Sequence, residues 1–228
     1  MKQGGSDVAK QAAGESAAEA VEDGMVVGLG TGSTAAHATR AIGRAVDAGL
    51  DVVGVPTSFQ SRELARDCGI PLADLDDVSV DLAIDGADEV AGGDLVKGGG
   101  AAHAREKIVD ASADRFLVVA DPTKEANVLS YPVPVEVLPM ARSTVATAVD
   151  HLGGDPALRR AEHKDGPVVT DNGNLVLDCD FGPIDDPAAL ASDLAGLPGV
   201  VEHGLFVDMA DEIHVGTPDG VTVRPLSE

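Results

Sequence analysis

The sequence predicts an α/β fold with a second, smaller α+β domain. In the first half of the chain, short apolar strands alternate with helix-length segments, which is typical of βαβ units on a parallel sheet. Glycine-rich or acidic turns follow these strands, as expected where ligands bind beyond the carboxyl ends of a parallel sheet. A proline-marked boundary follows at Tyr131 to Pro139. If the second arm of the strand pair around the turn at residues 171–173 is taken as the main strand, the order of elements beyond this boundary is β-α-β-β-α-β, which is a ferredoxin-like layout.

The first domain is predicted to be Rossmann-like and to comprise residues 1–130 and 207–228. Small and apolar residues at helical spacing from Asp7 to Val21 predict its first helix, which ends near Gly24. Strands and helices then follow in turn. The strands are expected at Met25 to Val27, Val52 to Val55, Val80 to Ile84, Leu95 to Val96, Asp211 to Gly216 and Val221 to Val223, and the helices at Ala35 to Ala48, Ser58 to Cys68 and from Gly98 to Gly100 onward.

The second domain is predicted to cover residues 131–206. A strand pair is expected around the turn Asp171-Asn172-Gly173. Nothing in this segment suggests chemistry, so we expect it to serve packing and subunit contacts. Its other strands are expected at Val133 to Leu138, Ala157 to Ala161 and Val200 to Phe206, and its helices at Ala141 to Leu152 and Pro187 to Gly196.

The chain carries 16 basic and 39 acidic residues, a formal net charge of −23. A charge this negative repels nucleic-acid phosphates and anionic membranes, so neither is an expected partner. No apolar run approaches the roughly 18 residues of a membrane span, and the N-terminus lacks the layout of a signal peptide, which favours a cytoplasmic protein. The acids are spread through the whole chain, as on the surface of a protein adapted to high salt.

The cysteines and histidines predict no metal site. Cys68 and Cys179 lie far apart and fit no metal or redox spacing, so we interpret them as buried small side chains. The histidines, at positions 37, 103, 151, 163, 203 and 214, show no H-E-x-x-H pattern or other local pairing.

A glycine-rich turn, residues 28–34 (GLGTGST), joins the first strand to the next helix. Backbone N–H groups and the dipole at a helix start favour an anion there. The dinucleotide fingerprint fails because Ser33 stands where glycine is required, and a Walker lysine is absent. The turn therefore predicts a site for a single phosphate, with a tight turn and an ordinary helix cap as the alternative.

Three acids, Asp85, Asp88 and Glu89, follow the strand that ends at Ile84. They do not form an EF-hand loop, because Ala87 occupies the third ligand position. In a chain with 39 acidic residues such a cluster is weak evidence by itself. Its weight depends on the residues that come next.

Lys97 and the triple glycine Gly98 to Gly100 follow a second short strand. The ammonium group and the glycine N–H groups are suited to stabilise a negatively charged oxygen in a transition state. Glu106, expected about two turns into the following helix, is a candidate base for a carbon-bound proton. Its alternative is an exposed partner for a neighbouring charge on the helix.

Several motifs together resemble ribose-5-phosphate isomerase of the A type. The likeness covers nearly the whole chain. It rests on GTGSTAAH (30–37), PTSFQ (56–60), DGADE (85–89), KGGGAA (97–102), REKIV (105–109), PVEVLPMAR (134–142), TDNGN (170–174), PGVVEHGLF (198–206) and GTPDG (216–220).

The resemblance implies an aldose-ketose isomerase that interconverts ribose 5-phosphate and ribulose 5-phosphate through an enediolate, in the pentose phosphate pathway. It implies no metal or cofactor, a sugar phosphate as the small-molecule partner, and a homodimer or homotetramer. Glu106 matches the family's base, while Asp85 and Lys97 match residues for ring opening and for stabilising the charged oxygen. Asp88 belongs to the same pocket.

The resemblance also implies the residues that bind the substrate. Lys124, and Lys10 on the first helix, match phosphate ligands, although an isolated helical lysine is usually only solvated. Three of six lysines would then serve the site, which concentrates positive charge in an acidic chain. His103 and Ala104 depart from the family pattern beside the glycine turn. The substrate-binding positions are Lys10, Thr31, Gly32, Ser33, Thr34, Gly86, Ala87, Gly98, Gly99, Gly100 and Lys124.

Two alternatives to the isomerase remain. A related sugar-phosphate deaminase or lactonase would lack the pairing of KGGG with REK. A non-catalytic sugar-phosphate sensor of the kind found in transcriptional regulators would need a helix-turn-helix, and only about 24 residues precede the first strand.

Overall fold

The computed structural model describes residues 5–163 and 165–226, and in it the chain forms two compact units. The predicted first domain also includes residues 1–4 and 227–228, which lie outside the described range. The sequence-based division placed residues 88–104 in the first domain, whereas the structure groups them with the second unit. The first unit comprises the residues up to Ala87, Arg105–Glu125 and those from Met209, and the second comprises Asp88–Ala104 and Ala126–Asp208.

The first unit contains most of the elements that the sequence predicted. Helix α4 begins in the second unit and belongs to the first unit only from Arg105 onward. The strands are β1 (Val26–Leu29), β2 (Val53–Pro56), β3 (Val80–Gly86), β6 (Ala113–Ala120), β12 (Glu212–Thr217) and β13 (Gly220–Pro225), and the helices are α1 (Asp7–Ala18), α2 (Ser33–Asp47), α3 (Phe59–Asp67), α4 (His103–Ser112) and the 3₁₀ turn η1 (Pro122–Lys124).

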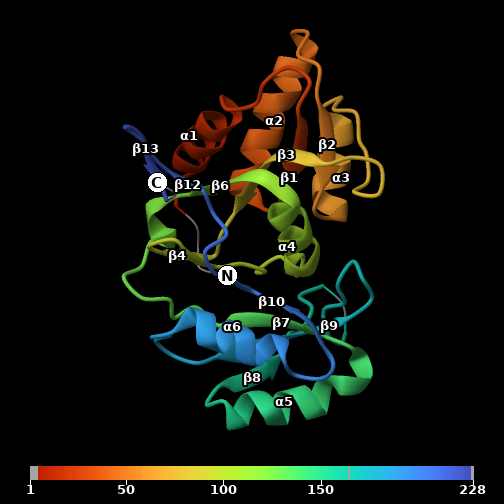
Figure 1. Ribbon diagram of the computed structural model, residues 1–228, viewed down its shortest axis with the longest axis vertical. Helices are drawn as coiled ribbons and strands as arrows, with labels where there is room; N and C mark the ends of the chain where they lie inside the picture. The colour runs from red at the N-terminus through yellow and green to blue at the C-terminus, as the bar shows by residue number, and fades with distance from the viewer. Residues whose placement is uncertain (1–4, 164, 227–228) are drawn as a thin grey trace. The chain divides into compact units, whose positions relative to one another are not determined.

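A six-stranded sheet in the order β13-β12-β6-β3-β1-β2 forms the centre of this unit. Neighbouring strands are parallel, except that β12 and β13 are antiparallel. The chain runs from β1 outward to β2 and then returns to β3 on the other side of β1 (Figure 1). The strand order therefore reverses between β1 and β3, and ligands bind at such a reversal in open α/β sheets.

Helices pack against both faces of this sheet. Val27 and Leu29 share a core with residues of α1 and α2, which lie beside each other over the sheet in Figure 1. Gly28, between them, instead faces Val109 of α4, since a Cβ there would lie 2.8 Å from Val109 Cγ1. Alternate residues of a strand point to opposite faces, so one face of β1 packs against α1 and α2 and the other against α4.

Strand β6 was not predicted from the sequence. Its residues from Phe116 to Ala120 are all buried, because β6 lies between β3 and β12 in the middle of the sheet. A strand covered on both faces shows a continuous apolar run rather than alternation. Such a run is hard to assign by periodicity, which explains the omission.

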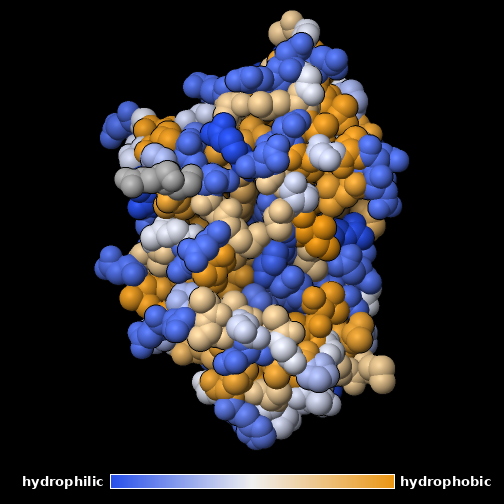
Figure 2. Space-filling view, in the orientation of Figure 1, coloured by the Kyte–Doolittle hydropathy of each residue, from blue (hydrophilic) through white to orange (hydrophobic). Residues whose placement is uncertain are grey.

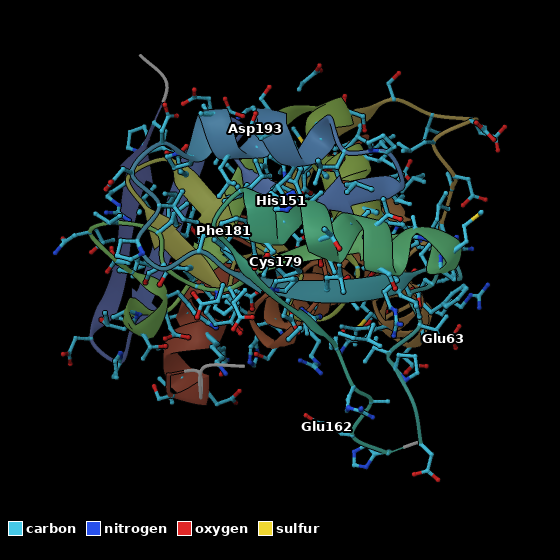
Figure 3. The ribbon with its side chains drawn as sticks, turned by 90° about the horizontal axis from the view of Figure 1, so that it is seen from below. Glu63, His151, Glu162, Cys179, Phe181 and Asp193 are labelled. Carbon is cyan, nitrogen blue, oxygen red and sulfur yellow. The ribbon has the colours of Figure 1, made fainter. Side chains whose placement is uncertain are left out.

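The second unit contains a four-stranded antiparallel sheet in the order β10-β7-β9-β8. With α5 and α6 the chain order is β-α-β-β-α-β, so the ferredoxin-like layout predicted from the sequence is confirmed. Figure 3 shows His151 on α5, Asp193 on α6, and the loop that carries Glu162 reaching away from both helices. The elements are β7 (Val133–Val137), η2 (Pro139–Ala141), α5 (Arg142–His151), β8 (Asp155–Leu158), β9 (Leu175–Asp180), α6 (Pro187–Ala195) and β10 (Val200–His203).

A small sheet in the order β11-β5-β4 explains why residues 88–104 join the second unit. The sequence predicted one strand from Val200 to Phe206, but the structure divides it at Gly204 into β10 and β11. A Cβ at Gly204 would lie 2.2 Å from the Lys97 carbonyl oxygen, so only glycine permits this approach. The strands of this sheet are β4 (Glu89–Ala91), β5 (Asp94–Val96) and β11 (Leu205–Phe206).

Hydrophilic residues are distributed over the whole of the face shown in Figure 2, with apolar residues scattered among them. This distribution agrees with acidic residues spread along the chain rather than gathered in one tail. The helices of residues 5–163 and 165–226 are each too short or too polar to cross a membrane.

Candidate active site

The loop after β1 and the end of β3 meet where the strand order reverses. Asp85, the next-to-last residue of β3, is completely buried. Its Oδ1 accepts hydrogen bonds from the backbone N–H groups of Thr31 at 2.9 Å and Gly86 at 2.7 Å. The carboxylate is therefore held at the carboxyl end of the sheet, beside Thr31, and Ala87 follows directly in the chain.

Gly30 makes this arrangement possible. A Cβ at position 30 would lie 2.3 Å from Asp85 Oδ1 and 2.5 Å from the Asp85 Cα. No side chain fits at these distances, so the glycine allows the two segments to touch. Gly30 begins the GTGSTAAH motif but was not predicted as a site residue.

Hydroxyl groups hold the Thr31 side chain from the other side. Thr31 Oγ1 lies 2.8 Å from Thr57 Oγ1 and donates to Ser58 Oγ at 2.7 Å. Thr57 and Ser58 follow β2 and are both buried. Neither residue was predicted as a site residue, although its place after a parallel strand is the signal that could have indicated a role there.

The N-terminus of α2 has the backbone features on which the predicted phosphate site rests. Gly32 is the N-cap residue with φ of 104°, a value that favours glycine. No side chain caps the helix among the described residues. The first N–H groups, at Ser33 and Thr34, are therefore open to a ligand with negative charge.

Glu106 lies in the first turn of α4 and is 4% exposed. The prediction of two turns into the helix was wrong, because α4 begins at His103 and not at the glycines. Val109, one turn later, packs against Gly28 of β1. A helix that connects parallel strands runs antiparallel to them, so Glu106 lies toward the strand ends that carry Asp85.

Lys10 and Lys124 belong to the same unit as the α2 terminus. A Cβ at Gly14, one turn after Lys10 on α1, would lie 2.9 Å from the Thr34 carbonyl oxygen, so this side of α1 faces the first turn of α2. Lys124 ends η1, where Asp121 caps the turn by accepting from the Thr123 N–H at 2.9 Å. Both lysines are partly exposed.

In the second unit, Lys97 is the largest of the fully buried side chains. Its backbone N–H donates to the Gly204 carbonyl at 2.8 Å, and its Nζ lies 5.3 Å from the centre of the Phe206 ring. A cation above an aromatic face is stabilised by the ring electrons. The ammonium group is thus held in place by β11.

Asp88 is bound by the glycine turn. Its Oδ2 accepts from the Gly99 N–H at 2.6 Å, and a Cβ at Gly99 would lie 2.5 Å from Asp88 Oδ1. The glycines do not open the helix directly, as the sequence analysis had expected. Instead the Ala101 N–H donates to the Gly98 carbonyl at 2.9 Å, closing a turn that also contains Gly100 and precedes α4.

Glu89, the third acid of the cluster, has a different task. Its Oε2 accepts from the backbone N–H groups of Ser130 and Tyr131 at 2.5 and 2.7 Å. The carboxylate therefore fixes the chain at the start of the ferredoxin-like segment. Within residues 5–163 and 165–226, no group of three or more His, Cys, Asp or Glu side chains is arranged to hold a metal ion.

Comparison with known proteins identifies the family. Residues 53–220 match the family model of ribose 5-phosphate isomerase A (phosphoriboisomerase A). The chain belongs to this family. It is 90% identical over 228 residues to the ribose-5-phosphate isomerase A of Haloarcula marismortui, and the match covers the whole of both chains. It is 68% identical over 233 residues to that of Halorubrum lacusprofundi, covering 96% of this chain and 97% of the relative.

Solved structures of the ribose-5-phosphate isomerase A family have the same fold. The enzyme of Methanocaldococcus jannaschii has a TM-score of 0.91 at 45% identity, covering 95% of this chain and 97% of its own. A D-ribose-5-phosphate isomerase in complex with phospho-erythronic acid has a TM-score of 0.92 at 43% identity, with the same coverage. The resemblance stated from the motifs is therefore confirmed.

Proposed function

We propose that this chain interconverts D-ribose 5-phosphate and D-ribulose 5-phosphate through an enediolate, as a step of the pentose phosphate pathway. One observation carries the proposal. At the end of the first unit's sheet, the buried carboxylate of Asp85 is bound to the loop that leads into α2, a helix that has no side-chain cap among the described residues. A phosphate and a polar sugar carbon chain match these two features. Membership of the isomerase family supports the same substrate.

The substrate phosphate binds the loop from Thr31 to Thr34, through the N–H groups and hydroxyls of Ser33 and Thr34, while the Thr31 N–H remains bound to Asp85. The open start of α2 supports this role, because its dipole and free N–H groups favour a dianion. Lys124 and Lys10 supply the cations that the phosphate needs in a chain of net charge −23. The contact of α1 with the first turn of α2 supports the inclusion of Lys10.

Glu106 is the base that moves the proton. In the open-chain aldose, it removes the proton from C2, and the electron pair shifts toward the carbonyl to form an enediolate. Return of the same proton to C1, with transfer of the hydroxyl proton from O2 to O1, gives the ketose, so the carboxylate is regenerated. Its near-complete burial supports this role, since a base shielded from water keeps the proton for the second transfer.

Asp85 assists the opening of the sugar ring, and Lys97 stabilises the negative oxygen of the enediolate, with Asp88 and the glycine turn as further substrate contacts. The fixed position of the Lys97 ammonium above Phe206 supports its use as a preorganised positive charge. Gly86, Ala87 and Gly98 to Gly100 contribute backbone groups only. No metal or cofactor takes part in any of these steps.

A coupled isomerase assay on the wild type and on Glu106→Gln tests the proposal. Loss of the base should lower kcat by roughly 10²–10⁴-fold. Glu63→Gln, an exposed change of the same type on α3, serves as the matched control and should retain full activity. Full activity of Glu106→Gln would contradict the base assignment, and loss of wild-type activity after EDTA treatment would contradict the metal-free mechanism.

We also propose that the protein is cytoplasmic, adapted to high salt and a homodimer or homotetramer. The net charge of −23 supports the adaptation to high salt. Exposed apolar side chains of the second unit support the third, since Met140 is 92% exposed and the adjoining Leu138 is 44% exposed. Light scattering on Met140→Lys would test this surface: an unchanged oligomer would exclude it as a subunit contact.

A further inference from the structure

Arg159 joins two parts of the second unit that are far apart in the sequence. It directly follows β8, and its side chain is 15% exposed. Its Nε donates to both carboxylate oxygens of Asp178, at 3.1 and 2.9 Å, and its Nη2 donates to Asp178 Oδ1. Its Nη1 donates to the carbonyl oxygens of Gly98 at 2.8 Å and Gly99 at 3.2 Å.

The guanidinium is oriented by the sheet before it reaches the glycines. Asp178 lies on β9, opposite Ala157 of β8. The Arg159 backbone extends the same ladder, because its N–H donates to the Val176 carbonyl at 2.9 Å and its carbonyl accepts from Val168 at 3.0 Å. A planar guanidinium that is bound to a carboxylate through two of its nitrogens cannot rotate. Its third nitrogen, Nη1, therefore points at the glycine turn.

The contact sets the direction of two peptide groups. All peptide bonds in the described chain are trans, so a carbonyl and the N–H of the next residue point in opposite directions. With the Gly98 carbonyl turned toward Arg159, the Gly99 N–H points away from it and donates to Asp88. With the Gly99 carbonyl turned the same way, the Gly100 N–H also points away from Arg159, toward the side where the Asp88 carboxylate lies.

We propose that Arg159 is a positioning residue for the isomerase reaction. It holds the glycine turn so that the Gly99 N–H fixes Asp88 and the Gly100 N–H is presented to the oxygen that becomes negative. The positive guanidinium group beside the two carbonyl oxygens also polarises their peptide groups, which makes the N–H groups of those peptides better donors. This inference rests on the proposed function, and it gives the ferredoxin-like segment a part in the chemistry beyond packing.

The composition of the turn explains why such a residue is needed. Three consecutive glycines have no side chains to pack and a wide range of backbone conformations, so the turn is not rigid by itself. Gly98 adopts φ of 103° and Gly99 is in close contact with Asp88. An external group must therefore select one conformation. Lysine is unsuited, because a single ammonium lacks the fixed fork that binds a carboxylate and two carbonyls together.

The test compares Arg159→Ala and Arg159→Lys with Arg160→Ala, in which the exposed neighbouring arginine is removed instead. We expect both Arg159 variants to lower kcat roughly 10- to 100-fold with little change in KM, because a misplaced group mainly affects the transition state. Ethylguanidine should restore part of the activity of Arg159→Ala and none of that of Glu106→Gln. Arg160→Ala should behave as the wild type.

Hydrogen exchange of the amides in residues 97–102 gives a readout that does not depend on activity. Faster exchange at Gly99 in Arg159→Ala, with an unchanged melting temperature, supports the positioning role. Unchanged kcat together with unchanged exchange would overturn it. If Arg159→Ala does not fold, Arg159→Lys decides, since normal kcat in that variant also overturns the inference. An inactive wild type would instead refute the proposed function, and the exchange result would still decide whether Arg159 orders the turn.

Discussion

The Thr31 backbone N–H donates a 2.9 Å hydrogen bond to the carboxylate of Asp85, so the loop after β1 is tied to the end of β3. The two residues are 54 positions apart in the sequence and meet only because β1 and β3 are adjacent parallel strands. A change that separates these strand ends should displace both the loop of residues 30–34 and the Asp85 carboxylate.

Gly30→Ala should separate them. A Cβ at this position would lie 2.3 Å from Asp85 Oδ1 and 2.5 Å from the Asp85 Cα, so the backbone must shift. We expect a loss of about 1–3 kcal/mol in the free energy of unfolding, as for other overpacked sites, and a fall in both kcat and substrate affinity. Urea unfolding and the isomerase assay measure these effects.

Gly196→Ala is the matched control for this change. Gly196 has φ of −74°, and a Cβ there would meet only backbone oxygens at 3.5 Å. It should therefore be neutral or slightly stabilising, since alanine reduces the freedom of the unfolded chain. Equal stability and activity of Gly30→Ala and the wild type would show that the strand ends are not closely coupled.

Lys124→Ala should weaken binding of the substrate phosphate while leaving the proton transfer intact. Loss of one charged hydrogen bond of about 1.5–3 kcal/mol corresponds to a rise in KM of roughly 10- to 150-fold, with kcat nearly unchanged. Steady-state kinetics on ribose 5-phosphate measures the two constants separately. Arg142→Ala, which removes an exposed cation from the start of α5, controls for the change in net charge.

Ribose without its phosphate provides a second control for Lys124. If Lys124 acts only on the phosphate, the wild type and Lys124→Ala should convert free ribose with the same kcat/KM. A defect of the variant on free ribose as large as that on ribose 5-phosphate would contradict the assignment.

Asp94→Asn should stabilise the protein near neutral pH. Burial, together with the nearby charge of Asp208, raises the pKa of Asp94 above its ordinary value of 3.8, although the Asp208 backbone N–H partly offsets the rise. The folded state therefore binds this proton more tightly than the unfolded state, and stability is lost as pH increases from 3.8 through the folded pKa. Asparagine removes this loss and keeps an acceptor for the Asp208 N–H.

Urea unfolding of the wild type and Asp94→Asn at about pH 7 and about pH 4.5 tests the sign, because a larger fraction of the Asp94 carboxyl is ionised at the higher pH. The advantage of the variant should be larger at the higher pH. Asp76→Asn, which removes one negative charge at an exposed position of the first unit, should show no such trend. An advantage that grows as the pH falls would show that Asp94 is stabilised in its charged form.

Local patterns in the sequence predicted the parts of the site that depend on neighbouring residues. The glycine loop before α2 and Asp85 near the end of β3 lie at the carboxyl ends of neighbouring parallel strands, whereas Lys97 follows β5 of the small antiparallel sheet. Contacts between distant segments were not predicted. Arg159 lies 61 positions from Gly98, and the fork with Asp178 that orients it exists only once β8 and β9 pair.

Boundaries in the sequence analysis failed where backbone conformation decided them. The helix was expected to start at the triple glycine, but Ala101 adopts φ of 60°, which interrupts any helix, and α4 begins two residues later. The strand from Val200 to Phe206 was expected to be continuous, but contact of Gly204 with the Lys97 backbone divides it. Neither event has a signature in hydrophobic periodicity.

The excess of acids predicts that stability depends on salt. With 39 acidic and 16 basic residues, the folded chain carries a net charge of −23, and compaction brings these charges closer together. Added salt reduces the repulsion, since the Debye length falls from about 30 Å at 0.01 M to about 3 Å at 1 M. The melting temperature should therefore rise steeply with KCl at low concentration and level off near about 1 M, where screening is complete over such distances.

Sucrose, which stabilises by exclusion without screening charge, is the control and should give a smaller, linear rise. A melting temperature that is the same in low and molar KCl, or that rises only in parallel with sucrose, would show that charge repulsion does not limit the stability of this protein.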